Sequence, residues 1–124
     1  MARYRVFNRT RPLAAPLWAT PCATWWCRFR GLMGVPHLDP REGLLLTWPY
    51  PSRWGTAVHM FGMRFDLAIV WLDPARRVVD VRIARAWRSV LVPRAAAQYV
   101  LELHPTRAPE FRVGDRITWE AWHE

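Results

Sequence analysis

The most restrictive feature of this sequence is an apolar run that lies between Asp66 and Asp73. Residues 67–72 are Leu, Ala, Ile, Val, Trp and Leu, so both faces of an extended segment would be apolar. The run is far shorter than the ~20 residues that cross a bilayer. A short apolar run of this kind is typical of a strand that is covered on both faces. We therefore expect residues 66–73 to form a central strand of a sheet.

Short segments with turn signals between them occupy most of the remaining chain. We expect an edge strand at 3–8 and further strands at 43–48, 56–63, 78–84, 99–103 and 116–121. Many short strands separated by glycine and proline favour a mostly β fold, either β-sandwich-like or a partly closed barrel. The length and the lack of an apparent linker predict a single domain over residues 1–124.

One short amphipathic helix is expected over about residues 21–33. Thr20 can cap its first turn, and Pro21 suits the first helical position, where its missing N–H costs nothing. Gly34 can close the helix in the left-handed conformation. Cys22 and Cys27 would then point to different sides of one helix and could not form a disulfide, so we expect both thiols to be reduced.

The charge of the chain comes from arginine alone. All 18 basic residues are Arg, and the formal net charge is +8. Because Arg suits phosphate contacts, nucleic-acid binding is one interpretation. The Arg residues are spread along the chain instead of forming a basic block, which weakens that interpretation. A coding bias towards Arg explains the same composition, and the scarcity of amides, with only Asn8 and Gln98, fits selection for heat. The nine Trp residues are expected to fill the core and its edges. The start lacks the apolar stretch of an export signal, so we expect a cytoplasmic protein without a membrane partner.

Six motifs, taken in order, resemble one protein family. They are RxxGLMG at 28–34, EGLLL at 42–46, VHMFGMRF at 58–65, IVWLD at 69–73, VLEL at 100–103 and VGDR at 113–116. Together they are similar to the family called Domain of Unknown Function 192, over roughly residues 12–120. The resemblance implies a compact β-sandwich-like domain with one helix, and it implies no activity.

Two departures from the family pattern carry structural expectations. The family usually places Pro-Ile-Asp after the Met-Arg-Phe step, whereas here Asp66 comes first, displaced by two strand positions or about 6–7 Å on the same face. Arg76 stands in a turn where the family prefers Gly. If that position is left-handed, Arg costs about 1 kcal/mol over Gly, so we predict a positive φ at Arg76 or a reshaped turn.

The candidate site is a shallow cleft bordered by His59, Met63, Arg64 and Glu102. In this hypothesis the chain is a non-catalytic binding or accessory domain for a small anionic or polar ligand. Arg64 would hold an anionic group, and His59 would supply a hydrogen bond. Trp48 or Trp54 from the Pro-rich loop would cover the ligand.

Three further residues, Arg28, Asp66 and Asp115, are expected to have structural or second-line roles. Arg28 or Arg64 would pair with the partly buried Glu102 carboxylate. Asp66 has the displaced position described above, and Asp115 follows Gly114 in a predicted turn.

Three other functions remain open at this point. A hydrolase-like enzyme could use His59 with a carboxylate, although no Ser or Cys stands in a nucleophile motif, and we assign no catalytic residue. A soft-metal protein could bind Cu(I) through His59 and Met63. An Arg-rich nucleic-acid binder needs its Arg side chains to converge on one face. The cysteine spacing does not match a zinc site, and no cofactor-binding loop is found, so we expect neither a metal nor a cofactor.

Overall fold

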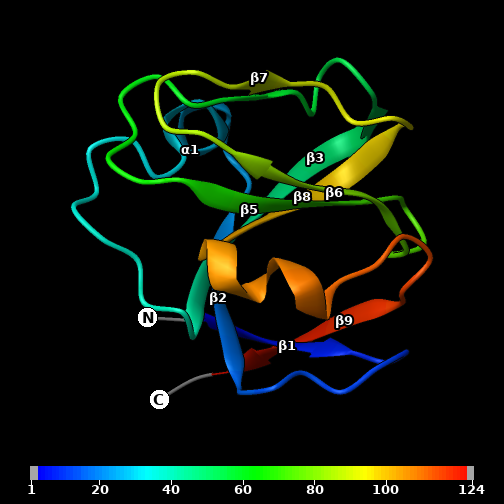
Figure 1. The fold of residues 1–124 in the computed structure, drawn as a ribbon. Coiled ribbons are helices and arrows are strands. Elements are labelled where there is room, and N and C mark those ends of the chain that lie inside the picture. Colours follow the sequence, from blue (N-terminus) through cyan, green and yellow to red (C-terminus); the bar gives the residue numbers. More distant parts are fainter. Residues whose placement is uncertain (1–2, 123–124) are drawn as a thin grey trace.

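The computed structural model describes residues 3–122, which form a mostly β fold (Figure 1). The strands are β1 (Arg3–Asn8), β2 (Leu17–Cys22), β3 (Glu42–Ser52), β4 (Val58–His59), β5 (Leu67–Leu72), β6 (Val78–Ala84), β7 (Val90–Leu91), β8 (Ala97–Leu103) and β9 (Ile117–Trp122). The helices are α1 (Trp25–Arg30) and the 3-10 helix η1 (Pro105–Glu110). A seven-stranded mixed sheet has the order β6-β5-β8-β3-β2-β1-β9, and β4 pairs with β7 in a small second sheet. The prediction of a mostly β, sandwich-like fold is confirmed.

The apolar run that follows Asp66 forms β5, with β6 on one side and β8 on the other. All six of its residues are buried. Two apolar layers meet it, because its alternate side chains enter different core clusters. This strand is therefore covered on both faces, as its composition predicts.

Two expectations about strands are wrong. Residues 3–8 form β1, which is not an edge strand, because it pairs with β2 and also with β9. The segment 56–63 is extended only at β4, where His59 pairs with Val90. A turn follows, with the Met63 N–H donating to the Met60 carbonyl over 3.3 Å and with Gly62 at φ +76°. This turn ends the period-two alternation that the sequence indicated.

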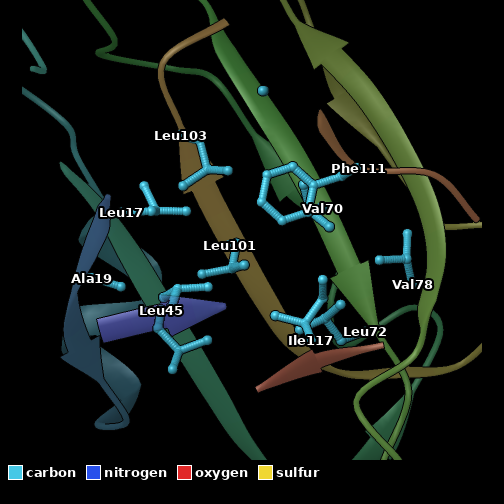
Figure 2. Packing of buried hydrophobic residues seen from close by; sticks show 12 residues of the cluster. Leu17, Ala19, Leu45, Val70, Leu72, Val78, Leu101, Leu103, Phe111 and Ile117 are labelled. Carbon is cyan, nitrogen blue, oxygen red and sulfur yellow. The ribbon is translucent and has the colours of Figure 1, made fainter. Parts of the chain in front are cut away.

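The large sheet curls until its β9 end approaches the β5–β6 turn. The N–H of Val78 donates to the Asp115 carbonyl over 2.8 Å, and the N–H of Ile117 donates to the Arg76 carbonyl over 2.9 Å. An isolated bridge between Arg77 and Arg116 lies between these bonds. The concave side holds the first core cluster, in which Ile117 packs with residues from β1, β2, β3, β5, β6 and β8 and with Phe111 beyond η1 (Figure 2).

A second core cluster lies on the other face of β3, β5 and β8. The chain segments that cover it are α1, the turn that follows β4, and β7, which Figure 1 shows together above these strands. Trp71 is fully buried there, and its indole N–H donates to the Thr56 carbonyl over 2.8 Å. The candidate site lies between this covering layer and the sheet.

The helix is shorter than predicted, and the expectation of reduced cysteines is wrong. The Thr24 hydroxyl, not Thr20, caps α1 by accepting from the Cys27 N–H over 3.1 Å. Cys22 ends β2, whereas Cys27 lies in α1, so their Cα atoms are 5.5 Å apart and the two form a disulfide. Within residues 3–122, no helix has the length or the apolar character needed to cross a bilayer.

The predicted left-handed turn residue is confirmed. Arg76 has φ +64°, and its guanidinium lies 3.8 Å from the ring centre of Trp119. A cation–π contact of this kind is worth about 0.5–2 kcal/mol, which offsets the ~1 kcal/mol backbone cost. The contact explains why Arg is tolerated at a position that favours glycine.

Candidate functional site

A small cavity lies between the covering layer and the large sheet. Its volume is about 30 Å³, which admits roughly two water molecules but no whole organic ligand. His59, Met63 and Glu102 line it, together with Arg28, so the structure brings together three of the four predicted cleft residues. Arg64 is exposed and does not line the cavity. The Gly62 turn separates Arg64 from this group.

Glu102 is the buried acid of the cavity. It projects from β8 between Leu44 on β3 and Ile69 on β5, and its exposed fraction is 5%. Within residues 3–122, its carboxyl group forms neither a hydrogen bond nor an ion pair, so the expected pairing with Arg28 or Arg64 is wrong. Burial raises the pKa of Glu102 to about 7, because water no longer solvates the charged form. The cavity therefore contains a carboxyl group that titrates near neutrality.

Gly31 forms a part of the cavity wall beside this carboxyl. The residue follows α1 with φ +50°, and its N–H donates to the Cys27 carbonyl over 2.7 Å. A Cβ at position 31 would lie 3.2 Å from Oε1 of Glu102. Glycine therefore allows both the positive φ and the close approach of the turn to the acid.

His59 joins α1 to the turn after β4. Its Nε2 lies 3.3 Å from the Phe29 carbonyl, and its Nδ1 accepts from the Phe61 N–H over 3.3 Å. These two contacts assign the proton to Nε2, because a carbonyl only accepts and an N–H only donates. Both ring nitrogens are thus engaged by the main chain, and neither bonds to a carboxylate within residues 3–122. The His–carboxylate pair predicted for the hydrolase-like alternative is therefore not formed in the part of the chain that the structure describes.

Arg28 anchors the helix over the cavity. Its Nη1 donates to the Ala23 carbonyl and, over 3.1 Å, to the Thr47 carbonyl of β3. The guanidinium also lies 5.4 Å from the ring centre of Trp48. Trp48 lines the cavity as expected, whereas Trp54 does not and is 72% exposed.

Met63 contributes a buried apolar wall. Its exposed fraction is 3%, and it packs in the second core cluster. In the part of the chain that the structure describes, no group of three or more His, Cys, Asp or Glu residues could hold a metal ion. A copper site through Met63 would also have to compete with the main-chain partners of His59.

The other two predicted acids lie outside the cavity. Asp66 accepts from the Ala86 N–H over 2.9 Å and from Arg85 over 2.8 Å, and these bonds lower its pKa. Asp115 accepts from Arg11, from Asn8 and from the Arg112 N–H. These bonds, led by that from Arg11, lower the pKa of Asp115 to about 2.

An exposed aromatic group beside the cavity was not predicted. The Trp residues were expected to fill the core and its edges, yet α1, which contains two of them, buries none of its residues. Trp25 and Trp26 both stack on Phe29, which contacts His59, which in turn stacks on Phe61. A groove of about 410 Å³ adjoins this aromatic row, lined by Trp26, Phe29, Arg30, Met33, Gly34 and Gly62. The adjacent tryptophans were the available signal, because neighbours on a helix cannot both face one core.

Comparisons with curated proteins find relatives in heat-loving archaea. A UPF0127 protein of Thermococcus kodakarensis is 39% identical over 103 residues, which cover 82% of this chain and 64% of that protein. A UPF0127 protein of Thermococcus gammatolerans is 39% identical over 95 residues, covering 75% of this chain and 60% of that protein. The chain thus spans less than two thirds of the length of these two relatives.

Solved structures share the fold at low sequence identity. A crystal structure from Sinorhizobium meliloti superposes with a TM-score of 0.82 at 18% identity and covers 95% of this chain and 92% of that chain. A protein of unknown function from Novosphingobium aromaticivorans gives a TM-score of 0.79 at 20% identity, covering 94% and 84%. The family model DUF192, described as Uncharacterized ACR, matches residues 10–119. The match confirms the resemblance seen in the motifs, and the chain belongs to the uncharacterised DUF192 family.

Proposed function

We propose that the protein is a non-catalytic binding domain that recognises a small polar ligand through a hydrogen-bond donor placed against Glu102. The observation that supports this proposal is an acid that is 95% buried, lines a cavity and has no partner within residues 3–122. A buried polar group without a partner costs free energy in the native fold. A ligand that supplies a hydroxyl or amino group would satisfy it.

The charges around the cavity favour a donor over an anion. Three arginines could supply positive charge here: Arg64 lies outside the cavity, Arg28 already donates to the Ala23 and Thr47 carbonyls, and Arg30 lines the cavity but is exposed. The acceptors include the Glu102 carboxyl. An anionic ligand would be repelled by the ionised form of that carboxyl, whereas an ammonium group would favour it.

The dimensions favour a ligand with a polar end and a flat apolar body. The cavity of about 30 Å³ holds a single functional group. Phe29, Arg30 and Met33 line both this cavity and the groove of about 410 Å³. A ligand would therefore insert its donor next to Glu102 and lay a ring against Phe29, where aromatic stacking adds about 0.5–1.5 kcal/mol.

The test is a set of three matched ligands that differ only in the polar end: phenethylamine, 2-phenylethanol and phenylacetate. Amide chemical shifts of Gly31 and Glu102 are followed by NMR during titration of the native protein, Glu102→Gln and Glu102→Leu. The amine and the alcohol are expected to shift both amides, and Glu102→Leu is expected to abolish the shifts. Glu42→Gln is the control, because Glu42 is exposed at the start of β3.

Two results would refute the proposal. One is preferential binding of phenylacetate, which would indicate an anion site. The other is equal binding of the amine to the native protein and to Glu102→Leu, which would show that the carboxyl group is not involved.

A further inference from the structure

A second surface lies on the outer face of β1, β2 and β9. Val6 and Asn8 of β1 are buried, so the alternate residues of this strand point to the other face. Directly paired residues share a face, and the register places Arg5 between Trp18 of β2 and Glu120 of β9. The outward set is Arg3, Arg5, Phe7, Trp18, Thr118, Glu120 and Trp122, with Arg9 immediately after β1. We call this set the Arg–aromatic face.

Guanidinium groups and rings alternate along this face. Arg3 lies 4.8 Å from the ring centre of Trp18, and Arg5 lies 5.2 Å from the same ring. Arg5 is also 5.2 Å from the Phe7 ring, which Arg9 approaches to 4.5 Å. Trp122 packs edge-on against Trp18 at 5.5 Å. A guanidinium in such a cation–π contact is attracted to the face of the ring.

The positive charge of the Arg–aromatic face is only partly balanced. Within residues 3–122, the Arg5 guanidinium has no hydrogen bond and no ion pair, and its Nε is buried without a partner. Glu120 lies opposite Arg5 in the register, but its side chain is 65% exposed and pairs with Arg9 at 3.7 Å. Arg9 also donates to the Thr118 hydroxyl over 2.8 Å. Arg5 is thus a half-buried cation whose N–H groups have no acceptor within the described residues.

Two clefts continue the Arg–aromatic face at its ends. One has a volume of about 360 Å³ and is lined by Arg5, Phe7, Arg9 and the loop 12–16. The other has about 330 Å³ and includes Arg3 and Trp18 in its lining. Because both clefts contain members of the face, they mark a path along β1 that a linear ligand could follow.

These observations favour a ligand that is an extended polyanion and also carries flat groups. Phosphates satisfy guanidinium N–H edges, and unpaired bases stack on aromatic rings and on Arg planes. A duplex keeps its bases stacked on one another, whereas a single strand can present base faces to aromatic rings. The net charge of +8 favours approach of any nucleic acid. We infer that the Arg–aromatic face binds single-stranded nucleic acid, independently of the cavity at Glu102.

The experiment measures fluorescence anisotropy of labelled oligodeoxythymidylate and oligouridylate with the full chain over a range of salt concentrations. For single strands the logarithm of the association constant falls with the logarithm of the salt concentration by ~0.7 per neutralised phosphate. Arg5→Gln is expected to reduce this slope by about 0.7. Trp18→Leu is expected to weaken binding about tenfold with an unchanged slope, because it removes stacking without removing charge.

Matched variants and competitors make the result decisive. Arg88→Gln removes the same charge from an exposed position on the loop before β7 and is expected to leave binding unchanged. Phe7→Leu provides a second ring deletion in case Trp18→Leu fails to fold, and thermal unfolding checks each variant. Heparin, duplex DNA of the same length and phosphatidylglycerol vesicles serve as competing polyanions.

Three results would overturn the inference. Equal affinity for heparin, with no loss in either ring variant, would show that charge alone is recognised. Tighter binding to duplex DNA than to single strands would exclude base stacking as the selecting contact. Binding to vesicles without binding to either oligonucleotide would assign the face to an anionic lipid surface.

Discussion

Glu102 stands where packing alone would place a leucine. Its neighbours on β8, Val100, Leu101 and Leu103, are all fully buried and apolar. An ionisable group at such a position makes the stability of the fold depend on pH. The dependence follows from the difference between the raised native pKa of about 7 and the ordinary value of 4.5.

Glu102→Gln is expected to stabilise the protein at alkaline pH. Below pH 4.5 the carboxyl is protonated in both the folded and the unfolded state; as the pH rises towards 7, the unfolded state loses its proton first. The free energy of unfolding therefore falls across this window, by up to about 3 kcal/mol. Denaturant unfolding at about pH 5 and about pH 8 should show the Gln variant gaining only at the higher pH. A difference in the free energy of unfolding between the native protein and Glu102→Gln that is the same at both pH values would contradict this prediction.

Asp115 has the opposite linkage. Its native pKa of about 2 lies below the ordinary value of 3.8, so its contribution to stability is present above pH 3.8 and is lost as the pH falls towards 2. Asp115→Asn is expected to lower the free energy of unfolding by about 2 kcal/mol at neutral pH. Acid titration of the folded fraction, with exposed Glu42→Gln as the control, should show a flatter profile for Asp115→Asn.

Single residues were predicted with mixed success, for a physical reason. Alternation within an assumed strand correctly grouped His59 with Met63, because both approach the same buried layer. The same assumption failed at Arg64, because the turn at Gly62 depends on a positive φ that period-two alternation does not encode. The role of Gly31 was also missed, since its close neighbour Glu102 is distant in sequence and adjacent only after folding.

At the scale of elements, α1 depends on contacts outside itself. It has six residues and buries none of them, and a helix this short is not stable alone in water. The Cys22–Cys27 disulfide, the Thr24 cap and the Arg28 bonds to main-chain carbonyls hold it in place. The aromatic row beside the cavity therefore depends on a covalent link.

Cys27→Ser is expected to lower the free energy of unfolding by about 2 kcal/mol, the loop-closure value for a short loop. The Arg28 and Gly31 amides, which bond within α1, should exchange with deuterium faster than in the native protein. Amides of β5 serve as the internal control, because their exchange rates should change only with the global stability of the protein. Unchanged exchange at Arg28 and Gly31 would show that noncovalent contacts alone fix the helix.

The wrong helix start has a specific structural cause. Thr20 and Pro21 carry helix-start signals, but residues 18–22 pair in parallel with β3 instead. At Pro21 the opposite side of β2 is free, because β1 pairs only with residues 17–19, so the missing N–H is tolerated there. Long-range strand pairing thus overrides a local capping pattern.

At the scale of the whole molecule, the two ends of the curled sheet meet through few residues. Ile117 is fully buried and lies where β9 meets both β1 and the Arg76 carbonyl. Ile117→Ala is expected to lower the free energy of unfolding by about 3 kcal/mol, with Val113→Ala, an exposed position, as the control. Loss of less than about 1 kcal/mol in thermal or denaturant unfolding would show that the closing contact is unimportant.

Composition and alternation were sufficient to predict the class of the fold but not the order and pairing of its strands. The buried apolar run correctly identified β5, because covering both faces leaves little choice. The strand order could not be predicted, since the parallel pairing of β2 with β3 depends on a connection that passes through α1. Neither could the pairing of β1 with β9, whose residues are separated by most of the chain.

That pairing has a consequence for biosynthesis. Arg3 lies opposite Trp122, so the first described strand acquires one of its two neighbours only after the last described strand has left the ribosome (Figure 1). Until then, one edge of β1 exposes unpaired main-chain groups that can join another nascent chain. Exchange of β9 between two copies is therefore the characteristic error to which this topology exposes the protein.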